Sequence, residues 1–387
     1  MDTAIVVGAG PAGLAAAAGL RRARIPTVVL EQGDAIAPAW RARYDRLRLN
    51  SARWYSTLPN GPAYRPGTGT FPSRDDVVDY LDAYAEHHAL DVRLGVKVER
   101  IDREGERWRL ETSTGAMQAR QVIVAGGYEH RPFVPAWPGR ARYRGSVTHA
   151  AGYRDPEPFA GQDVLVVGPG CSGAEIAYDL ATGGAARVRL AVRTPPNIIV
   201  RAPIGAPLAV AFMRLPPRVA DAVMRFVRRR TVGDLSAFGL PIPEEGVFSR
   251  LRRLHVAPMI VDAEVIDAIR GRRIEIVGAL EGFDEAGVLL ADGDRIEPDA
   301  VIAATGYRSG LEPVVGHLGV LDGHGVPRAL RGEAASGLRF VGYDPRPAAL
   351  RFGGREAERA AKAIARSGSR RGLIGRSLPS AQRAGAG

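Results

Sequence analysis

Cysteine is almost absent from this chain of 387 residues, in which Cys171 is the single example. A lone cysteine excludes a disulfide framework, a multi-cysteine zinc or iron–sulfur site and a Cys-x-x-Cys redox pair. The seven histidines lack metal-ligand spacing, so we expect no metal. Apolar runs long enough to span a bilayer, about 18 residues, are also missing, and the N-terminus does not resemble a signal peptide. These absences predict a cytoplasmic protein without stable membrane insertion.

Lysine is rare as well. Only Lys97 and Lys362 occur among 53 basic residues, so the net charge of +11 comes from arginine. The arginines are spread along the chain without a nucleic-acid fold signature or interleaved aromatic residues, so we expect solvated charge and no nucleic-acid partner. The composition is 45% hydrophobic and 25% charged, as in folded globular proteins, and the length predicts two domains or one with a large insertion.

A first glycine motif lies near the start of the chain. The β-branched run 3–7 leads into G-A-G-P-A-G at 8–13, a predicted helix over 14–22 and a strand over 27–30 that ends at Glu31. Such glycines allow a tight turn, close approach to a pyrophosphate and close helix–strand packing, while the carboxylate accepts from a ribose hydroxyl. The motif predicts a dinucleotide site with these candidate contacts: Gly8, Gly10, Pro11, Ala12, Gly13, Glu31 and Gln32.

The same arrangement recurs in the middle of the chain. A strand over 163–167 leads into G-P-G-C-S-G at 168–173, a helix over 174–182 and a strand over 187–192. Arg193 then stands where the first unit has a carboxylate. Arginine suits the 2′-phosphate of NADP, so the first site is interpreted as binding FAD and the second NADP, although Arg193 could instead belong to the general arginine bias. The candidate contacts are Gly168, Gly170, Cys171, Ser172, Gly173, Arg193 and Thr194.

Two dinucleotide sites and one cysteine leave few classes of protein. A flavoprotein that reduces disulfides would need a reactive cysteine pair. A flavin reductase that passes electrons to a ferredoxin-like protein and a monooxygenase that passes them to oxygen both remain possible. A non-catalytic protein that senses NADP is the third hypothesis.

The segment before the second motif narrows this choice. Gly145, His149, Tyr153 and the basic Arg154 match the pattern F-x-G-x-x-x-H-x-x-x-Y/F followed by a basic residue, with Tyr143 at the usual phenylalanine. This pattern between two glycine motifs resembles the flavin-containing monooxygenases. For Gly145, His149 and Tyr153 we expect a linker role at the NADP site rather than proton transfer.

Other segments are similar to the plant YUCCA-type indole-3-pyruvate monooxygenases. Residues 44–49, 58–59, 238–241, 261–262 and 304–309 carry this likeness. The pair at 50–51, Asn-Ser, instead resembles the broader flavin-containing family.

The motifs and the resemblance imply an α/β fold of two doubly wound, Rossmann-like domains, with the NADP domain inserted into the FAD domain. Strands ending in glycine near 125 and 304 are expected where the chain crosses between domains. The expected boundaries are 1–150 and 290–365 for the FAD domain and 151–289 for the NADP domain, with a helical insertion at about 203–258 and a disordered tail over 366–387.

The resemblance also implies a chemistry. FAD would accept a hydride from NADPH, and the reduced flavin would react with molecular oxygen to form a flavin hydroperoxide. The substrate would be a small nitrogen or sulfur nucleophile, or a 2-oxo acid such as indole-3-pyruvate. Asn50 is implied as the catalytic residue, with a turn asparagine as the alternative. Further implied cofactor contacts are Trp40, Leu49, Ser51, Thr305, Gly306 and Tyr307.

An apolar stretch over 207–230 ends in three arginines. Pro216-Pro217 interrupts it and predicts two short helices. We favour a core or lid insertion over contact with a membrane surface.

Overall fold

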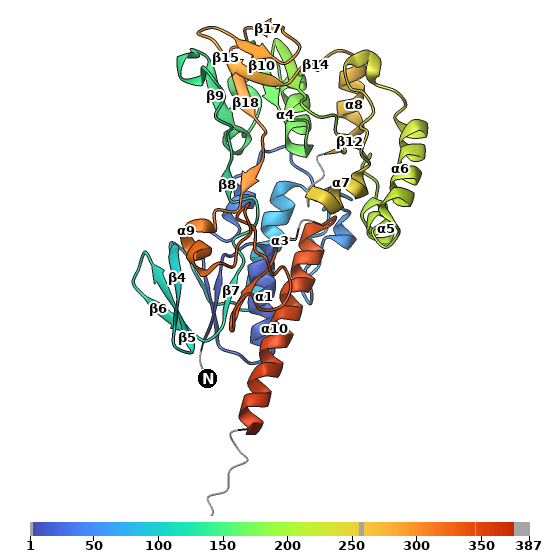
Figure 1. Cartoon of the computed structure of the whole chain (residues 1–387). Coiled ribbons are helices and arrows are strands. Elements are labelled where there is room, and N and C mark those ends of the chain that lie inside the picture. The colour runs from blue at the N-terminus through green and yellow to red at the C-terminus, as the bar shows by residue number, and fades with distance from the viewer. Residues whose placement is uncertain (1–2, 255–258, 345, 375–387) are drawn as a thin grey trace, which may run out of the picture.

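The protein folds into two lobes, each built on a parallel β-sheet (Figure 1). The computed structural model describes residues 3–254, 259–344 and 346–374. The expectation of a mixed α/β fold with parallel sheets is confirmed.

The first sheet has five parallel strands with β1 at its centre. The chain passes from β1 to β2 on one side and later places β7 on the other side, so a topological switch point lies at the carboxyl end of β1. Short β-branched runs suit these strands because both of their faces are buried. In order across the sheet, the strands are β20 (Leu338–Phe340), β7 (Val122–Val124), β1 (Ala4–Val7), β2 (Thr27–Leu30) and β3 (Val92–Arg93).

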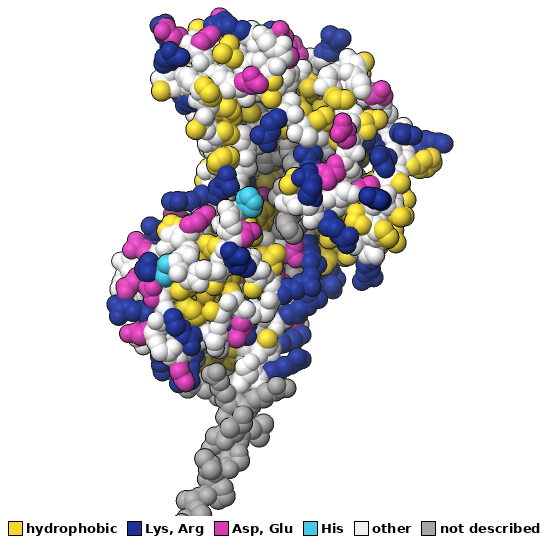
Figure 2. All heavy atoms as spheres, in the orientation of Figure 1, with side chains coloured by type: hydrophobic (Ala, Val, Ile, Leu, Met, Phe, Trp, Pro, Cys, Tyr) yellow, Lys and Arg dark blue, Asp and Glu magenta, His cyan; other side chains and the backbone are white. Residues whose placement is uncertain are grey.

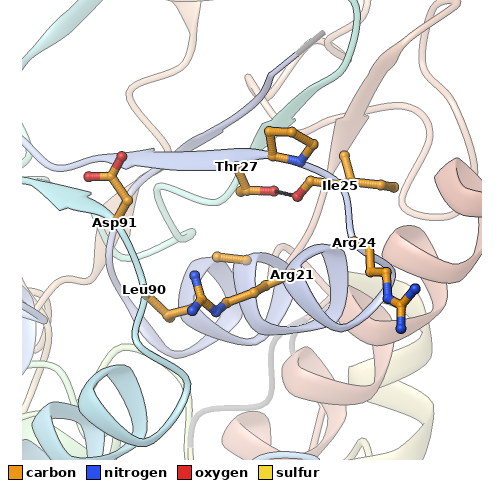
Figure 3. A pocket seen from close by; sticks show the side chains of 8 residues that line it. Arg21, Arg24, Ile25, Thr27, Leu90 and Asp91 are labelled. Carbon is orange, nitrogen blue, oxygen red and sulfur yellow. Dashed lines mark hydrogen bonds between the residues drawn. The ribbon is translucent and has the colours of Figure 1, made fainter. Parts of the chain in front are cut away.

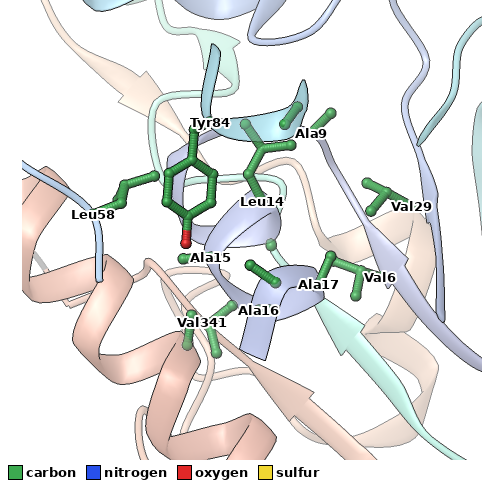
Figure 4. Packing of buried hydrophobic residues seen from close by; sticks show 14 of the residues in the cluster. Val6, Ala9, Leu14, Ala15, Ala16, Ala17, Val29, Leu58, Tyr84 and Val341 are labelled. Atoms are coloured by element: carbon green, nitrogen blue, oxygen red, sulfur yellow. The ribbon is translucent and has the colours of Figure 1, made fainter. Parts of the chain in front are cut away.

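Helices cover one face of this sheet and a small antiparallel sheet covers the other. On the helical face, the alanines of the first helix let it approach Val6 and Val29 closely (Figure 4). On the opposite face, Trp108 and Leu110 pack against Ile5 and Val28. The covering elements are α1 (Pro11–Arg22), α3 (Arg74–His87), α10 (Ala349–Ile374), β4 (Val98–Glu104), β5 (Arg107–Thr112) and β6 (Met117–Ala119).

The second lobe repeats this three-layer plan. Its five parallel strands have β10 at the centre, helices on one face and a three-stranded antiparallel sheet on the other. In order the strands are β14 (Glu275–Val277), β11 (Arg187–Ala191), β10 (Asp163–Val167), β18 (Ala300–Ala303) and β9 (Ser146–His149). The layers are completed by α4 (Cys171–Thr182), α8 (Ala263–Arg270), β15 (Leu280–Phe283), β16 (Val288–Leu290) and β17 (Arg295–Ile296).

Several details differ from the sequence expectations. The expected boundaries at residues 150 and 290 do not follow the sheets, because β9 and β18 hydrogen-bond within the second sheet. A doubly wound sheet would carry helices on both faces, whereas an antiparallel sheet covers one face here. The strands β4 and β5 alternate exposed and buried residues, which suits a sheet with one solvated face.

The expected tail from residue 366 begins inside α10, which continues to Ile374. The part of α10 that packs in the core around α1 includes Ala357, Ala361 and Ile364. Residues 375–387 lie outside the described residues.

The expected insertion is helical and interrupted at Pro216-Pro217. It comprises α5 (Gly205–Phe212), α6 (Pro217–Thr231) and α7 (Val247–Leu254), while 255–258 lie outside the described residues. No helix in the described part of the chain is long and apolar enough to cross a membrane.

Short elements complete the fold. They are α2 (Pro38–Arg41), α9 (Glu312–Val315), the paired β8 (Arg131–Pro132) and β19 (Tyr307–Arg308), the paired β12 (Asn197–Ile198) and β13 (Met259–Ile260), and 3-10 turns at Arg53–Tyr55, Arg140–Arg142, Ala150–Gly152, Glu157–Phe159, Ser236–Phe238 and Gly316–Leu318.

The contact between α1 and α10 can be tested by adding a methyl group to α1 and removing one from α10. A Cβ added at Gly19 would lie 2.7 Å from the Cβ of Ala361. Gly19→Ala should therefore destabilise the protein, because overpacking costs about 1–3 kcal/mol, more than the roughly 1 kcal/mol of helix propensity gained. Adding Ala361→Gly removes the overlap, so a double-mutant cycle from urea unfolding should give a coupling of at least about 1 kcal/mol. Additive effects would contradict this contact.

Candidate active site

The first glycine loop forms an open cradle at the carboxyl end of β1. Gly8 has a φ of +101°, and a Cβ there would lie 2.8 Å from the carbonyl oxygen of Ala125. A Cβ at Gly13 would lie 1.9 Å from the Gly8 carbonyl oxygen, so both positions require glycine. A Cβ at Gly10 would meet nothing within 4 Å. The loop therefore leaves space beside the first turn of α1, whose N–H groups and positive dipole end could hold a phosphate.

The second loop repeats this geometry at the carboxyl end of β10. Gly168 has a φ of +110°, and a Cβ there would lie 2.6 Å from the carbonyl oxygen of Ala304. A Cβ at Gly173 would lie 1.8 Å from the Gly168 carbonyl oxygen. Gly170, Cys171 and Ser172 continue this loop into the first turn of α4. Both lobes therefore have a helix N-terminus pressed against a glycine turn at the same place in the sheet.

The residues at the two equivalent strand ends carry opposite charges. Glu31 is buried, and its carboxylate accepts hydrogen bonds from the backbone N–H groups of Ala9 (2.8 Å) and Gly33 (2.9 Å). Gln32 next to it is exposed. Arg193 and Thr194 are exposed beyond the end of β11, and the ion pairs within the described residues do not include Arg193. A carboxylate is thus fixed beside the first cradle, and an accessible guanidinium lies beside the second.

Asn50 joins the two lobes at the second cradle. Its Nδ2 lies 3.6 Å from the sulfur of Cys171, and its Oδ1 accepts a hydrogen bond of 3.1 Å from Arg201. Burial raises the pKa of the Cys171 thiol to about 12, so this thiol stays protonated at neutral pH. The structure therefore brings together a residue of the first lobe and a loop residue of the second, which the sequence places far apart.

Behind Asn50 lies a buried ionic cluster that the sequence motifs did not reveal. Arg201 lies 3.3 Å from a carboxylate oxygen of Glu175 and 3.0 Å from one of Asp262. The Tyr44 hydroxyl donates to the other Glu175 oxygen at 2.8 Å across the lobe junction. Burial, followed by the charge of Asp262, raises the pKa of Glu175 to about 7. The only earlier signal was the likeness of segments 44–49 and 261–262 to the plant enzymes.

The segment that contains Gly145, His149 and Tyr153 makes several contacts near the lobe junction. His149 Nδ1 accepts from the Ala151 N–H at 3.0 Å, which assigns the proton to Nε2, and Nε2 donates to the Gly306 carbonyl at 2.9 Å. Burial lowers the pKa of His149, which favours this neutral form. The Tyr153 hydroxyl donates to Asp179 at 2.8 Å. A Cβ at Gly145 would lie 2.4 Å from the ring of Tyr143, so bulk is excluded there.

The paired strands β8 and β19 carry the chain between the lobes, in the middle of Figure 1. Thr305 donates to the Phe133 carbonyl, and the Gly306 carbonyl accepts from the Phe133 N–H at 3.0 Å. The Tyr307 hydroxyl accepts from Arg43 at 3.1 Å. These three residues therefore lie in the crossing beside the second cradle.

The remaining predicted contacts lie in the first lobe. Trp40 is half-buried and Leu49 buried, and both belong to the core around α1. The Ser51 hydroxyl is 2.7 Å from that of Ser56. The core around α1 therefore extends as far as Leu49, the residue directly before Asn50 at the lobe junction.

The described surface is hollowed between the lobes, and basic side chains border the hollow (Figure 2). A separate small pocket of about 220 Å³ lies at the opposite edge of the first sheet, between the end of α1 and the start of β2 (Figure 3). Its residues, including Arg21, Thr27 and Asp91, are away from the carboxyl strand ends where such sheets bind ligands. The junction is therefore the candidate site.

Comparison with known families gives the general class first. The family described as "Pyridine nucleotide-disulphide oxidoreductase" matches residues 5–201, about half of the chain, and this match includes both glycine motifs. The single cysteine cannot supply the dithiol that this description mentions.

Individual relatives narrow the class. Indole-3-pyruvate monooxygenase YUCCA1 of Oryza sativa subsp. japonica is 35% identical over 89% of this chain and 87% of its own length. A double mutant of the flavin monooxygenase from Stenotrophomonas maltophilia is 26% identical, with a TM-score of 0.73 over 95% of this chain and 99% of that one. OTEMO, solved with FAD and NADP, shares the fold at 16% identity, with a TM-score of 0.71 over 95% and 85% of the two chains.

The chain therefore belongs to the flavin monooxygenase family, close to the indole-3-pyruvate monooxygenases, which confirms the resemblance seen in the sequence. Members of this family are oxidoreductases.

The raised pKa of Glu175 predicts a pH-dependent stability. A carboxyl whose pKa is higher in the folded chain stabilises the fold below its ordinary pKa of 4.5, and this contribution is lost as the pH rises through about 7. Glu175→Gln cannot ionise. Its thermal midpoint relative to the unmodified protein should therefore rise between about pH 5 and about pH 8. Glu264→Gln, an exposed glutamate, is the control, and a constant difference for Glu175→Gln would contradict this effect.

Proposed function

We propose that this protein is an FAD-containing, NADPH-dependent monooxygenase whose first lobe binds FAD and whose second lobe binds NADPH. The observation that carries the proposal is the pair of equivalent glycine loops, each at the carboxyl end of a central strand, with opposite charges at equivalent neighbouring strand ends. Glu31 suits free ribose hydroxyls, and Arg193 suits a 2′-phosphate. When bound, NADPH supplies a hydride, and the reduced flavin supplies the electrons that activate molecular oxygen.

The first cradle fits the FAD pyrophosphate. The open space at Gly10 would admit a phosphate beside the first turn of α1, where Pro11 and Ala12 lie. The Glu31 carboxylate is held by two backbone N–H groups, so it is already oriented beside the loop. Gln32, Trp40, Leu49 and Ser51 are the further candidate contacts from the first lobe.

The second cradle fits NADPH because it repeats the close contact between the first and third glycines and has a guanidinium at the neighbouring strand end. Gly168, Gly170 and Gly173 would place the backbone against its pyrophosphate, while Arg193 and Thr194 would bind the 2′-phosphate. The segment that passes between the lobes would border both cofactors through Thr305, Gly306 and Tyr307.

Asn50 is the proposed catalytic residue. Arg201 donates to its Oδ1, which leaves the Nδ2 donor of the amide turned toward the Cys171 loop and the junction. A neutral amide can bind a reactive oxygen species without the desolvation cost of a charge. The Cys171 thiol would stay protonated, and the lone pair of His149 Nδ1 accepts from the Ala151 N–H, so neither group would compete as nucleophile or base.

Indole-3-pyruvate is the first substrate to test, because it appears in the name of the relatives that share about a third of the sequence. A small nitrogen or sulfur nucleophile is the second, because the pair at 50–51, Asn-Ser, resembles the broader family. Family membership favours oxygen over a ferredoxin-like protein as electron acceptor and favours an enzyme over a non-catalytic sensor.

The activity can be tested by following NADPH oxidation, oxygen uptake and product together in the FAD-loaded protein. We expect indole-3-pyruvate to be decarboxylated with one NADPH consumed per product. Asn50→Ala should keep NADPH oxidation but lose product about 10-fold or more and release hydrogen peroxide, because a positioned hydrogen bond is lost.

Asn197→Ala, which removes another half-buried amide of the chain, should remain coupled. Product from a thioether or an amine instead would identify the second substrate class. NADPH oxidation only with an added protein acceptor would overturn the proposal.

The role of Arg193 predicts a cofactor preference. Arg193→Gln should raise the KM for NADPH roughly 10-fold or more, because hydrogen bonds to a charged group contribute about 1.5–3 kcal/mol, and should leave that for NADH nearly unchanged. Arg187→Gln, at the amino end of the same strand, is the matched control. An equal change for both nucleotides would exclude Arg193 as the phosphate-binding residue.

A further inference from the structure

The helical insertion has an exposed apolar surface. We use "α5–α6 face" for the exposed large apolar residues on and next to these two helices, which are Ile204, Leu208, Leu215, Val219, Val223, Phe226 and Val227. These seven are most of the large hydrophobic residues that are exposed in the described part of the chain. Phe226 is 59% exposed and Ile204 65%. Such a concentration on one short segment is unusual, because scattered apolar residues are the norm on a soluble surface.

The pattern of α6 separates an inner side from an outer side. Ala220, Asp221 and Arg228 are buried against the rest of the insertion. Val219, Val223 and Phe226 follow the helical spacing i, i+4, i+7 on the outer side. Figure 1 places α6 at the outer edge of the molecule, and Figure 2 shows apolar side chains along that edge. The apolar residues of α6 therefore lie on the outer side of this helix, opposite its buried residues.

Arginines form a stripe beside these apolar residues. Arg218, Arg225 and Arg229 repeat at i, i+7, i+11 and are exposed. The guanidinium of Arg230 lies 5.1 Å from the ring centroid of Phe226. The stripe thus lines the apolar face with cations along the whole length of α6.

The acidic residue of this segment is turned inward. Asp221 is the only acid between 204 and 231, where six arginines occur. Its carboxylate is buried and accepts from the backbone N–H groups of Phe248 (2.8 Å) and Ser249 (3.1 Å). The acidic groups that line a pocket with Arg218 and Arg225 are the inward-turned Asp221 and the pair Glu244 and Glu245 before α7, so α5 and α6 themselves present only apolar groups and positive charge outward.

From this charge pattern we propose that the α5–α6 face docks on an anionic phospholipid surface. Apolar side chains beside an arginine stripe match the boundary between acyl chains and phosphate headgroups. A guanidinium forms bidentate hydrogen bonds with a phosphate group. A second copy of the chain fits less well, because a two-fold contact would bring the same arginine stripe together from both sides. The face would lie on the membrane surface rather than cross it.

Vesicle flotation of the full-length protein tests the docking. With vesicles of equal parts phosphatidylcholine and phosphatidylglycerol, we expect the protein to float at low salt and to dissociate at high salt. With phosphatidylcholine alone it should stay in solution. Arg225→Gln with Arg229→Gln should weaken binding roughly 25-fold, at about fivefold per arginine. Val223→Ser with Phe226→Ser should weaken it at least about 10-fold, because the buried apolar area is lost.

Matched controls carry the same substitutions elsewhere on the surface. Arg144→Gln and Leu289→Ser change exposed residues of the second lobe and should bind as well as the unmodified protein. Circular dichroism checks that each variant is folded.

Three results would overturn the proposal. They are equal binding to neutral and anionic vesicles, no binding to either, and a dimer in solution that Val223→Ser with Phe226→Ser abolishes. The last result would identify a second copy of the chain as the occupant of the α5–α6 face.

Discussion

The structure depends on a close contact between two glycines of one loop, which occurs once in each lobe. In each lobe the third glycine of the loop, Gly13 or Gly173, lies against the carbonyl of the first, with no room for even a methyl group. This contact presses a helix N-terminus onto the end of the central strand. The open space at Gly10 and the placement of Glu31 and Arg193 at equivalent strand ends beside the two loops go with this contact. A larger residue there would displace the helix and the cradle together.

The local parts of this arrangement could be predicted from the sequence, and the long-range parts could not. Spacing alone places the loops, Glu31 and Arg193, because strand, turn and helix follow each other directly. Arg201, Glu175 and Asp262 belong to no glycine motif and come from separate segments of the second lobe, so only the folding of that lobe brings them together. The domain boundaries differ from the sheets for a similar reason, because β9 and β18 join the second sheet by pairing with distant strands. The alternation of polar and apolar residues over Arg107–Thr112 indicates a strand with one solvated face, but it does not show which sheet that strand covers.

The lobe junction is polar where most domain cores are apolar. The Tyr44 hydroxyl and the Asn50 amide reach across it to Glu175, Cys171 and Arg201. A buried ionic cluster contributes little net stability, since desolvation offsets its attraction, but it permits few alternative arrangements. The contacts of Tyr44 and Asn50 with this cluster and its neighbour Cys171 are directional hydrogen bonds, which restrict how the two lobes are oriented. That orientation is what an enzyme needs when one cofactor must meet another across two domains.

The packing of α10 along α1 has a consequence for the order of synthesis. The second lobe is complete in sequence once β18 has been made, whereas the first lobe lacks β20 and α10 until almost the whole chain exists. On the ribosome, the inserted lobe can therefore fold while the earlier lobe still exposes the apolar face of α1. The first lobe is therefore begun first but completed last, and its apolar surface stays uncovered longest during synthesis.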